Sequence, residues 1–453
     1  MRAVPVSKTR RWLAVLLLPA IFASACSEAK DESKPASDAS AKPGTPNGKQ
    51  DYELPTATEC KADLIACAKF STLEPHVPDA PKVAAGEPIK IGMINQETAA
   101  LGAFPELTKT AQAGTKFINK YLNGVDGRPL ELTTCDLVNP LDAQGSLGCA
   151  QQMIDEGVVA VLGGIDLSGE GIQTLSDNGI PYVGGIPVSS AAGRAELSFQ
   201  FSGGTWGALV AYLKHAADND AKNVSIVYMD YGVIGEADEV ANKAADQLGI
   251  NVNLFSYGIG AMFDLAPIIN GALETGPDAI VILAADAGCP AAFSSVEQSA
   301  TKIPVYLIGA CASPKILEAA GDTVIGKIFS IESKLEESEP DLVFFTGMLA
   351  EFDPSVDAVG VSTVEIRSLF NLYSIMRQVG GENIDSKSIV TALRATKNEP
   401  SFMGHPYTCD GKQFPELPAF CAPQQMLITT SSVGSFQRIT DEWVDVLAVL
   451  NGE

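Results

Sequence analysis

The stretch from residue 89 to residue 135 constrains the fold of this chain more than any other. Residues 89–94, Ile-Lys-Ile-Gly-Met-Ile, predict a buried strand, and residues 105–122 predict an amphipathic helix that follows a polar, Ala- and Gly-rich loop. A Gly-containing turn then leads into a second apolar strand that ends at Cys135. A strand, a helix and a second strand joined in this way form a βα unit of a parallel sheet. The loop after the first strand lies at its carboxyl end, where open α/β sheets bind ligands.

The alternation of strands and helices continues and falls into two similar halves that meet near Gly203. The apolar runs are continuous, as expected for strands that are covered on both faces. Strands are predicted at 89–94, 130–135, 158–162, 181–183, 224–229, 251–255, 279–283, 305–308, 327–330 and 425–430. Helices are predicted at 105–122, 142–156, 206–218, 235–248, 265–274, 290–300, 338–352, 361–379 and 386–395. The pattern predicts two α/β lobes, with an ordinary flavodoxin-like domain as the alternative.

The N-terminus is typical of a targeting segment. Basic residues precede a short apolar run at 12–22, and Ala-Ser-Ala-Cys follows at 23–26. We expect residues 1–25 to be a signal peptide and Cys26 to be the acylated first residue of a lipoprotein. Plain secretory cleavage is the alternative, because Ala23 stands where a lipobox most often has Leu. Residues 27–56 lack a hydrophobic period and predict a flexible tether.

The charge of the chain limits its partners. Lys and Arg total 31 against 55 Asp and Glu, so the formal charge is −24. Such an acidic chain repels nucleic acid and anionic membrane surfaces. We therefore expect no nucleic-acid partner and contact with a membrane only through the lipid anchor.

Nine cysteines occur, and eight remain after Cys26. An even number in an exported chain favours disulfides, although eight cysteines allow 105 pairings. Pairing of near neighbours predicts Cys60–Cys67, Cys135–Cys149, Cys289–Cys311 and Cys409–Cys421. The chain has no C-x-x-C motif and only three widely spaced histidines, so we expect no metal site.

Enzyme motifs are weak in this sequence. Residues 321–328 nearly match a phosphate-binding loop, but Ile328 replaces the Ser or Thr that would hold Mg²⁺. No G-x-S-x-G motif occurs, and Ser168 has no evident His base. We therefore expect neither catalysis nor a cofactor.

The run Asn-Gly-Val-Asp-Gly-Arg-Pro-Leu-Glu-Leu at 123–132, together with the βα unit around it, resembles the Leu/Ile/Val-type substrate-binding proteins of ABC transporters. These are also called type I periplasmic binding proteins. The resemblance implies two flavodoxin-like lobes joined by a hinge that the chain crosses three times, here near Gly203, Ile331 and Ser401. It assigns residues 88–203 and 332–400 to the first lobe and residues 204–331 and 401–453 to the second. Residues 26–87 would be a lipidated tether with a Cys-stapled segment.

Several predicted strand ends carry polar or aromatic residues that are candidates for ligand binding. Hydroxyl groups and helix-start amides suit a carboxylate or a carbonyl, aromatic rings form apolar walls, and an acid suits an ammonium group. Each residue is equally consistent with a structural role as a helix cap, a turn residue or a core residue. The candidates are Phe104, which falls where the family places a loop aromatic, Asp166, Ser168, Ser189, Trp206, Tyr231 and Asp286, with Asp230 beside Tyr231.

One departure from the family bears on the ligand. Amino-acid binders of this type place a Glu after the strand that matches 305–308, but residues 309–313 here are Gly-Ala-Cys-Ala-Ser. The resemblance implies a monomeric solute-binding lipoprotein that delivers a small amphipathic ligand to an ABC permease. That ligand would be a branched-chain amino acid or a related apolar or aromatic acid. The alternatives are a ligand sensor with the same fold that signals to a membrane partner, and a secreted hydrolase.

Overall fold

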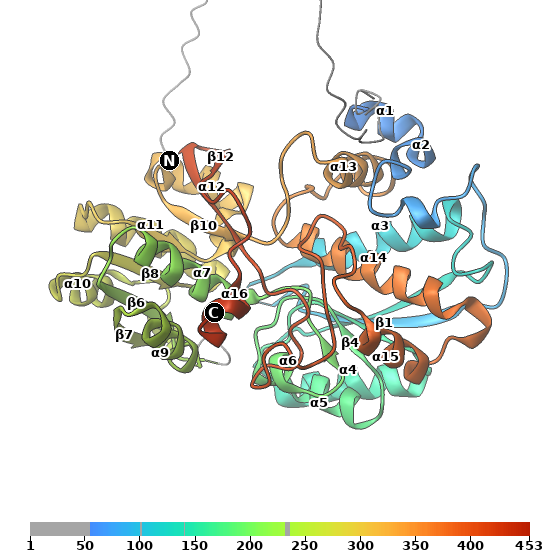
Figure 1. Ribbon diagram of the computed structural model, residues 1–453, viewed down its shortest axis with the longest axis horizontal. Helices are drawn as coiled ribbons and strands as arrows, with labels where there is room; N and C mark the ends of the chain where they lie inside the picture. The colour runs from blue at the N-terminus through green and yellow to red at the C-terminus, as the bar shows by residue number, and fades with distance from the viewer. Residues whose placement is uncertain (1–54, 100–101, 140, 232–235) are drawn as a thin grey trace, which may run out of the picture. The chain divides into compact units, whose positions relative to one another are not determined.

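The computed structural model describes residues 55–99, 102–139, 141–231 and 236–453 (Figure 1). The expected signal peptide, Cys26 and the tether up to residue 54 lie outside the described residues. Within the described ranges, no helix is both long and apolar enough to cross a bilayer.

The first lobe is built on a sheet of five parallel strands. The strands are β1 (Ile89–Asn95), β2 (Leu130–Asp136), β3 (Val161–Gly163), β4 (Tyr182–Val183) and β5 (Ser198–Phe199), in the order β2-β1-β3-β4-β5. The helices of this lobe are α3 (Pro105–Tyr121), α4 (Ala143–Glu156), α5 (Glu170–Asp177), α6 (Ser190–Arg194), α13 (Pro340–Phe352), α14 (Val361–Val379) and α15 (Ser386–Ala395), with η6 (Gly381–Asn383) between the last two.

Both faces of this sheet are buried, which explains the continuous apolar run of β1. Successive side chains of a strand point to opposite faces. Ile91 and Met93 accordingly join the core formed with α3 and α14, whereas Ile94 joins the core formed with α4 and α5. The helices therefore leave only the edges and ends of the sheet uncovered.

The second lobe is built on a seven-stranded mixed sheet in the order β12-β11-β10-β9-β8-β6-β7. Its strands are β6 (Asn223–Met229), β7 (Asn251–Tyr257), β8 (Ala279–Leu283), β9 (Val305–Leu307), β10 (Ile328–Ile331), β11 (Met426–Ser432) and β12 (Ser435–Arg438). Strands β6 to β10 pair in parallel, and β11 and β12 pair antiparallel. The helices are α7 (Gly204–Asp218), α9 (Ala237–Leu248), α10 (Ala266–Glu274), α11 (Cys289–Ser299), α12 (Pro314–Ala320) and α16 (Val446–Asn451), with the short helices η2 (Ile259–Ala261), η3 (Asp286–Gly288), η4 (Gly309–Ala312) and η5 (Gly321–Val324).

The predicted fold class is confirmed: two parallel-dominated α/β sheets form two lobes. Strand β3 begins later than expected, at Val161, because its ladder with β1 involves only three residue pairs. The short elements β5, β12, α5, α6, α12 and α16 were not predicted. Residues 321–327 form η5 and the loop into β10, in place of a phosphate-binding loop.

The cysteine-stapled segment packs on the first lobe as two short helices, α1 (Ala57–Ala62) and α2 (Leu64–Ala68), which η1 (Glu74–His76) follows. Asp63 ends α1 and caps α2, because its side chain accepts a hydrogen bond from the Ala66 amide at 3.0 Å. Helix α1 lies so close to α13 that a Cβ on Gly347 would come within 2.6 Å of the Cys60 Cβ. Thr72 donates its amide and hydroxyl hydrogens to the Asp341 carboxylate, both at 2.6 Å.

The chain passes between the two cores at three places. The first two passages lie at Gly203 and after Ile331. The third differs from the expected boundary at Ser401, because Phe402 and Tyr407 still pack in the first core. The chain reaches the second sheet only at β11, and the intervening residues contact both cores.

The cysteines pair in sequence order. The disulfides are Cys60–Cys67, Cys135–Cys149, Cys289–Cys311 and Cys409–Cys421. Cys135–Cys149 joins β2 to α4 within the first lobe, and Cys289–Cys311 joins α11 to η4 within the second lobe.

Candidate functional site

Asp166 organises the loop after β3. It is 1% exposed, and its carboxylate accepts hydrogen bonds from the Ser146 hydroxyl at 2.6 Å and the Gly169 amide at 3.0 Å. The amide and hydroxyl of Ser168 donate to the same carboxylate, both at 3.1 Å. Burial raises the pKa of Asp166, although these hydrogen bonds act in the opposite direction. Because protein donors occupy its carboxylate, Asp166 shapes the loop and orients Ser168.

Ser189 lies against the same loop from the end of β4. It is the N-cap residue of α6, but its side chain makes no capping hydrogen bond. Its hydroxyl is buried and has no hydrogen-bond partner among the described residues. A Cβ on Gly169 would come within 2.7 Å of the Ser189 Oγ, so the loops after β3 and β4 touch. Gly169, and not Ser168, is the N-cap residue of α5.

Phe104 is the half-buried N-cap residue of α3, at the end of the loop after β1. Asn95 fixes the start of that helix, since its amide donates to the Phe104 carbonyl at 2.9 Å and to the Thr108 hydroxyl at 3.1 Å. The neighbouring Gln96 donates to the Gly102 carbonyl at 2.6 Å. Buried polar side chains therefore hold described parts of the loops after β1 and β3.

In the second lobe, Tyr231 follows β6 and is half-buried. Burial is the main cause of its raised pKa, and the charges of Glu170 and Asp166 add to the effect. Asp166 lies in the loop after β3, and Glu170 is the first residue of α5, which follows that loop. Segments that follow strand ends in the two lobes are also in direct contact, because Arg194 of α6 pairs with Glu239 of α9 at 3.1 Å.

Asp286 begins η3 after β8 and is half-buried. Burial raises its pKa, and the nearby charge of Lys315 opposes that rise. Burial likewise raises the pKa of Glu106 in the first turn of α3, and Asp286 is among the charges that contribute. The sequence analysis missed Glu106 and Lys315. The position of Glu106 in the first turn after the β1 loop was the one available indication, but acids are common there in any helix.

Trp206 is buried in the first turn of α7, and its indole nitrogen has no hydrogen-bond partner among the described residues. It is 1% exposed, and its ring lies 5.6 Å from the ring of Phe420 and 5.7 Å from the guanidinium group of Arg194. A Cβ on Gly193 would come within 2.3 Å of the indole ring. Protein atoms therefore enclose Trp206 beside the passage between the lobes. Asp230, the neighbour of Tyr231, is exposed.

Glu332 joins the three passages between the lobes. One carboxylate oxygen accepts hydrogen bonds from the Gly203 amide at 2.8 Å, the Gly204 amide at 3.1 Å and the Gln425 side chain at 2.7 Å. The other oxygen pairs with Arg367 of α14 at 3.0 Å, and the Glu332 carbonyl also accepts from that guanidinium. Arg367 is 2% exposed, so its charge depends on this partner. Neither residue was singled out from the sequence.

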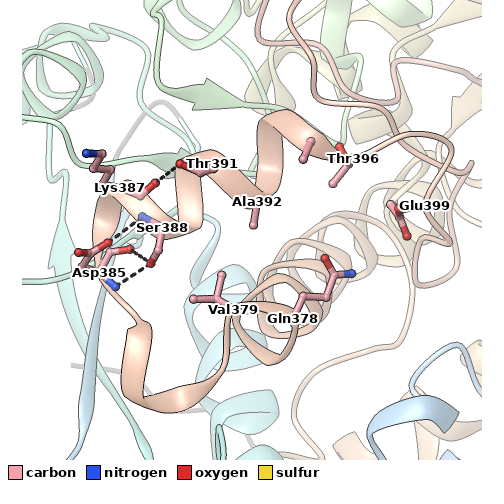
Figure 2. Close-up of a pocket in the computed structure, with 10 residues that line it drawn as sticks. Gln378, Val379, Asp385, Lys387, Ser388, Thr391, Ala392, Thr396 and Glu399 are labelled. Carbon is pink, nitrogen blue, oxygen red and sulfur yellow. Dashed lines mark hydrogen bonds between the residues drawn. The ribbon is translucent and has the colours of Figure 1, made fainter.

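A cavity of about 610 Å³ lies elsewhere, between the end of α14 and α15. The hydrogen bonds between its lining residues in Figure 2 lie within α15 and its N-terminal cap, which Asp385 and Ser388 form. Ser368 of α14 contacts the end of β4 through the Gly185 amide. Gln378, which lines the cavity, lies ten residues farther along the same helix, or about 15 Å away. This cavity is not at the strand ends. In the parts of the chain that the structure describes, no group of three or more His, Cys, Asp or Glu side chains is placed to hold a metal ion.

Comparisons with known proteins agree with this geometry. Residues 88–419 match a family model described as periplasmic binding protein. No match was found among the curated proteins. Among solved structures, the chain is similar to the leucine-binding protein LivK of Thermotoga maritima MSB8, with 16% identity, a TM-score of 0.65, and coverage of 78% of this chain and 98% of that one.

Two further structures show the same fold. The fatty acid ABC transporter substrate-binding protein of Thermomonospora curvata has 16% identity, a TM-score of 0.66, and coverage of 82% of this chain and 97% of that one. The type 1 periplasmic binding protein of Bordetella pertussis Tohama I has 16% identity, a TM-score of 0.63, and coverage of 79% and 100%. At these identities the structures establish the fold, and the family model establishes the membership. This chain belongs to the periplasmic binding protein family, with the two-lobed type I fold of the leucine-binding proteins.

Proposed function

We propose that this protein is an extracytoplasmic solute-binding lipoprotein that delivers a small amphipathic ligand to an ABC importer. The ligand is a branched-chain amino acid or a related apolar or aromatic acid. The observation that carries the proposal is the contact between segments that follow strand ends in the two lobes, since Arg194 of α6, after β4, pairs with Glu239 of α9, after β6, at 3.1 Å. Open α/β sheets bind ligands at such ends, and two facing sets of loops enclose a small solute.

The first lobe supplies a donor for a carboxylate. The Ser189 hydroxyl is buried and unpartnered among the described residues, whereas Ser168 already donates its amide and hydroxyl hydrogens to Asp166. An unpaired buried hydroxyl is costly, so a ligand oxygen that accepts its hydrogen bond is favoured. The half-buried Phe104 and Tyr231 provide apolar surface for the rest of the ligand.

The second lobe supplies a partner for an ammonium group in a different place from that of other amino-acid binders. No acid follows β9, where Cys311 is disulfide-bonded. Asp286, with Glu106 of the first lobe, is the substitute. Burying an ammonium group unpaired would be strongly unfavourable. An ionised Asp286 therefore favours an amino acid, and a protonated Asp286 favours a related acid that has no ammonium group.

The mechanism is closure of the lobes around the ligand, without bond chemistry. The ligand stabilises the closed form because it contacts both lobes only in that form. The permease then recognises the closed form.

Calorimetry with matched ligands tests the proposal. We expect leucine and its 2-keto acid both to bind, and Ser189→Ala to weaken both by about tenfold, the value of one hydrogen bond to a charged group. Asp286→Asn should weaken leucine selectively. Asp322→Asn, an exposed acid in η5, is the matched control. Absence of binding across amino, keto and aromatic acids would contradict the proposal, and tight leucine binding by Asp286→Asn would contradict the role of Asp286.

The pH dependence of binding gives a second readout. Burial raises the pKa of Asp286 and of Glu106, so both carboxyls protonate at a higher pH than exposed acids do. We expect the affinity for leucine to fall as the pH is lowered, starting at a higher pH than the protonation of exposed acids, and the affinity for the keto acid to change less.

The lipid anchor at Cys26 is tested independently of the ligand. Intact-mass analysis of the mature protein should show a diacylglycerol-modified Cys26, and the Cys26→Ser variant should be released from membranes. An unmodified N-terminus at residue 26 would refute the anchor.

A further inference from the structure

The loop of residues 409–421 contacts both lobes. The Cys409–Cys421 disulfide closes it, and both cysteines are buried in the core of the first lobe. Phe414, Leu417 and Phe420, which lie between them, pack in the core of the second lobe. We call residues 409–421 the strap.

Backbone hydrogen bonds fix the strap to the first lobe. The Gln200 amide donates to the Ala419 carbonyl at 2.8 Å, and the Cys421 amide donates to the Gln200 carbonyl at 2.9 Å. The Arg394 guanidinium of α15 donates to the Cys409 carbonyl at 3.0 Å. Because these hydrogen bonds and the disulfide all attach the strap to the first lobe, the strap moves with that lobe.

Side-chain contacts join the strap to α9 of the second lobe. Lys243 of α9 pairs with Glu416 at 2.8 Å, and its ammonium lies 4.2 Å from the centre of the Phe414 ring. Arg194 of the first lobe also reaches this helix, with Glu239 at 3.1 Å and with Glu236. The charges alternate in sign, so the first lobe offers a cation to the start of α9 and an anion to its middle.

We propose that the strap is a latch on the hinge: the first lobe carries it, and its grip on α9 limits how far the second lobe swings open. The strap contacts α9 through one partly exposed ion pair and one cation–π contact, which are individually weak. When the lobes separate, these contacts break before the buried contacts of Phe414, Leu417 and Phe420 with the second core, and the backbone bonds and the disulfide to the first lobe persist. The strap thus sets the balance between open and closed forms in the absence of ligand.

The test compares variants of the ligand-free protein. Lys243→Met and Glu416→Gln should each raise the radius of gyration in X-ray scattering and speed amide exchange in α9 about threefold, the effect of losing one such pair. Lys214→Met is the control, because Lys214 pairs with Asp218 at 2.7 Å within α7 and spans no gap between lobes. That control should leave both readouts unchanged.

The double variant Cys409→Ser/Cys421→Ser should open the protein by the same measures. If that variant fails to fold, the Lys243 and Glu416 variants still decide. A Lys243→Met/Glu416→Gln double variant with the radius and the α9 exchange of the wild type would overturn the proposal. The inference uses the proposed function only in assuming lobes that move. A protein that binds no solute but opens in these variants would keep the latch and refute the function.

Discussion

At the scale of single residues, Glu365 shows how a buried group limits stability. This residue of α14 is fully buried, and neither of its carboxyl oxygens has a hydrogen-bond partner among the described residues. Burial raises its pKa well above the ordinary range, so the carboxyl is neutral in the folded protein. Glu365 lies three residues before Ser368 of α14, whose hydroxyl accepts a hydrogen bond from Gly185 in the loop after β4.

The Glu365→Gln substitution should stabilise the protein more as the pH rises. Above the unfolded pKa of about 4.3, the folded state binds a proton that the unfolded state has lost, so the wild type loses stability with increasing pH until the folded pKa is reached. Gln has no such proton, and the gain should grow by up to about 1.4 kcal/mol per pH unit in this window. Urea unfolding at pH 5, 6.5 and 8 measures it. The exposed Glu351→Gln variant is the control, and a gain independent of pH would show that Glu365 is ionised.

Residue roles were the least predictable part of this protein. Loop positions could be inferred because apolar runs end where strands end, and Ser189 and Phe104 lie at such ends. Burial of Trp206 and occupation of Asp166 by four donors depend on residues far away in sequence. Glu332 and Arg367 are 35 positions apart and meet only in the folded chain, so no local pattern marks them.

At the scale of elements, the approach of α14 to the end of β4 requires a residue without a side chain. Gly184 has φ +73, and a Cβ there would lie 2.0 Å from the Ser368 hydroxyl oxygen of α14. That hydroxyl accepts a hydrogen bond from the Gly185 amide at 3.1 Å. The helix thereby supports the loop that carries Ser189.

The Gly184→Ala substitution should cost about 3 kcal/mol, which combines a left-handed backbone with overpacking against α14. Gly157→Ala separates the two effects. Gly157 has a similar φ of +69 but no atom within 4 Å of its Cβ position, so its substitution should cost only about 1 kcal/mol. Chemical denaturation of both variants gives the difference, and equal costs would show that α14 yields to the added methyl group.

Elements themselves were predicted well because their patterns are local. The bounds of α14, α15 and β8 agree with the prediction, since long periodic or fully apolar segments are unambiguous. Of the two strands of two residues, β4 was predicted at 181–183, whereas β5 was not, because so short a strand depends on its neighbours in the sheet. The late third passage between lobes reflects the strap, whose contacts with both cores no sequence period reveals.

At the scale of the whole molecule, the hinge is organised around a buried ion pair. Glu332 accepts from residues of the first and third passages, and Arg367 holds it from within the first lobe. Removing one partner of a buried pair leaves the other charge uncompensated.

The Glu332→Gln substitution should therefore lower the free energy of unfolding by about 3 kcal/mol, because the buried Arg367 loses its counter-charge. The same change loosens the hinge, so exchange of the Gly203 and Gly204 amides should accelerate. Glu351→Gln removes an exposed pair with Lys120 and should cost less than about 1 kcal/mol. Matching losses in the two variants would mean that Arg367 finds another partner.

The stapled segment at the start of the fold determines where mechanical load enters the molecule. Any pull on the residues before α1 passes through the Cys60–Cys67 loop and the Thr72–Asp341 hydrogen bonds into α13. These contacts belong to the first lobe alone, so neither the hinge nor the second lobe bears the force. Closure of the second lobe would consequently do no work against the proposed tether. Drag on an anchored molecule would leave its open–closed balance unchanged.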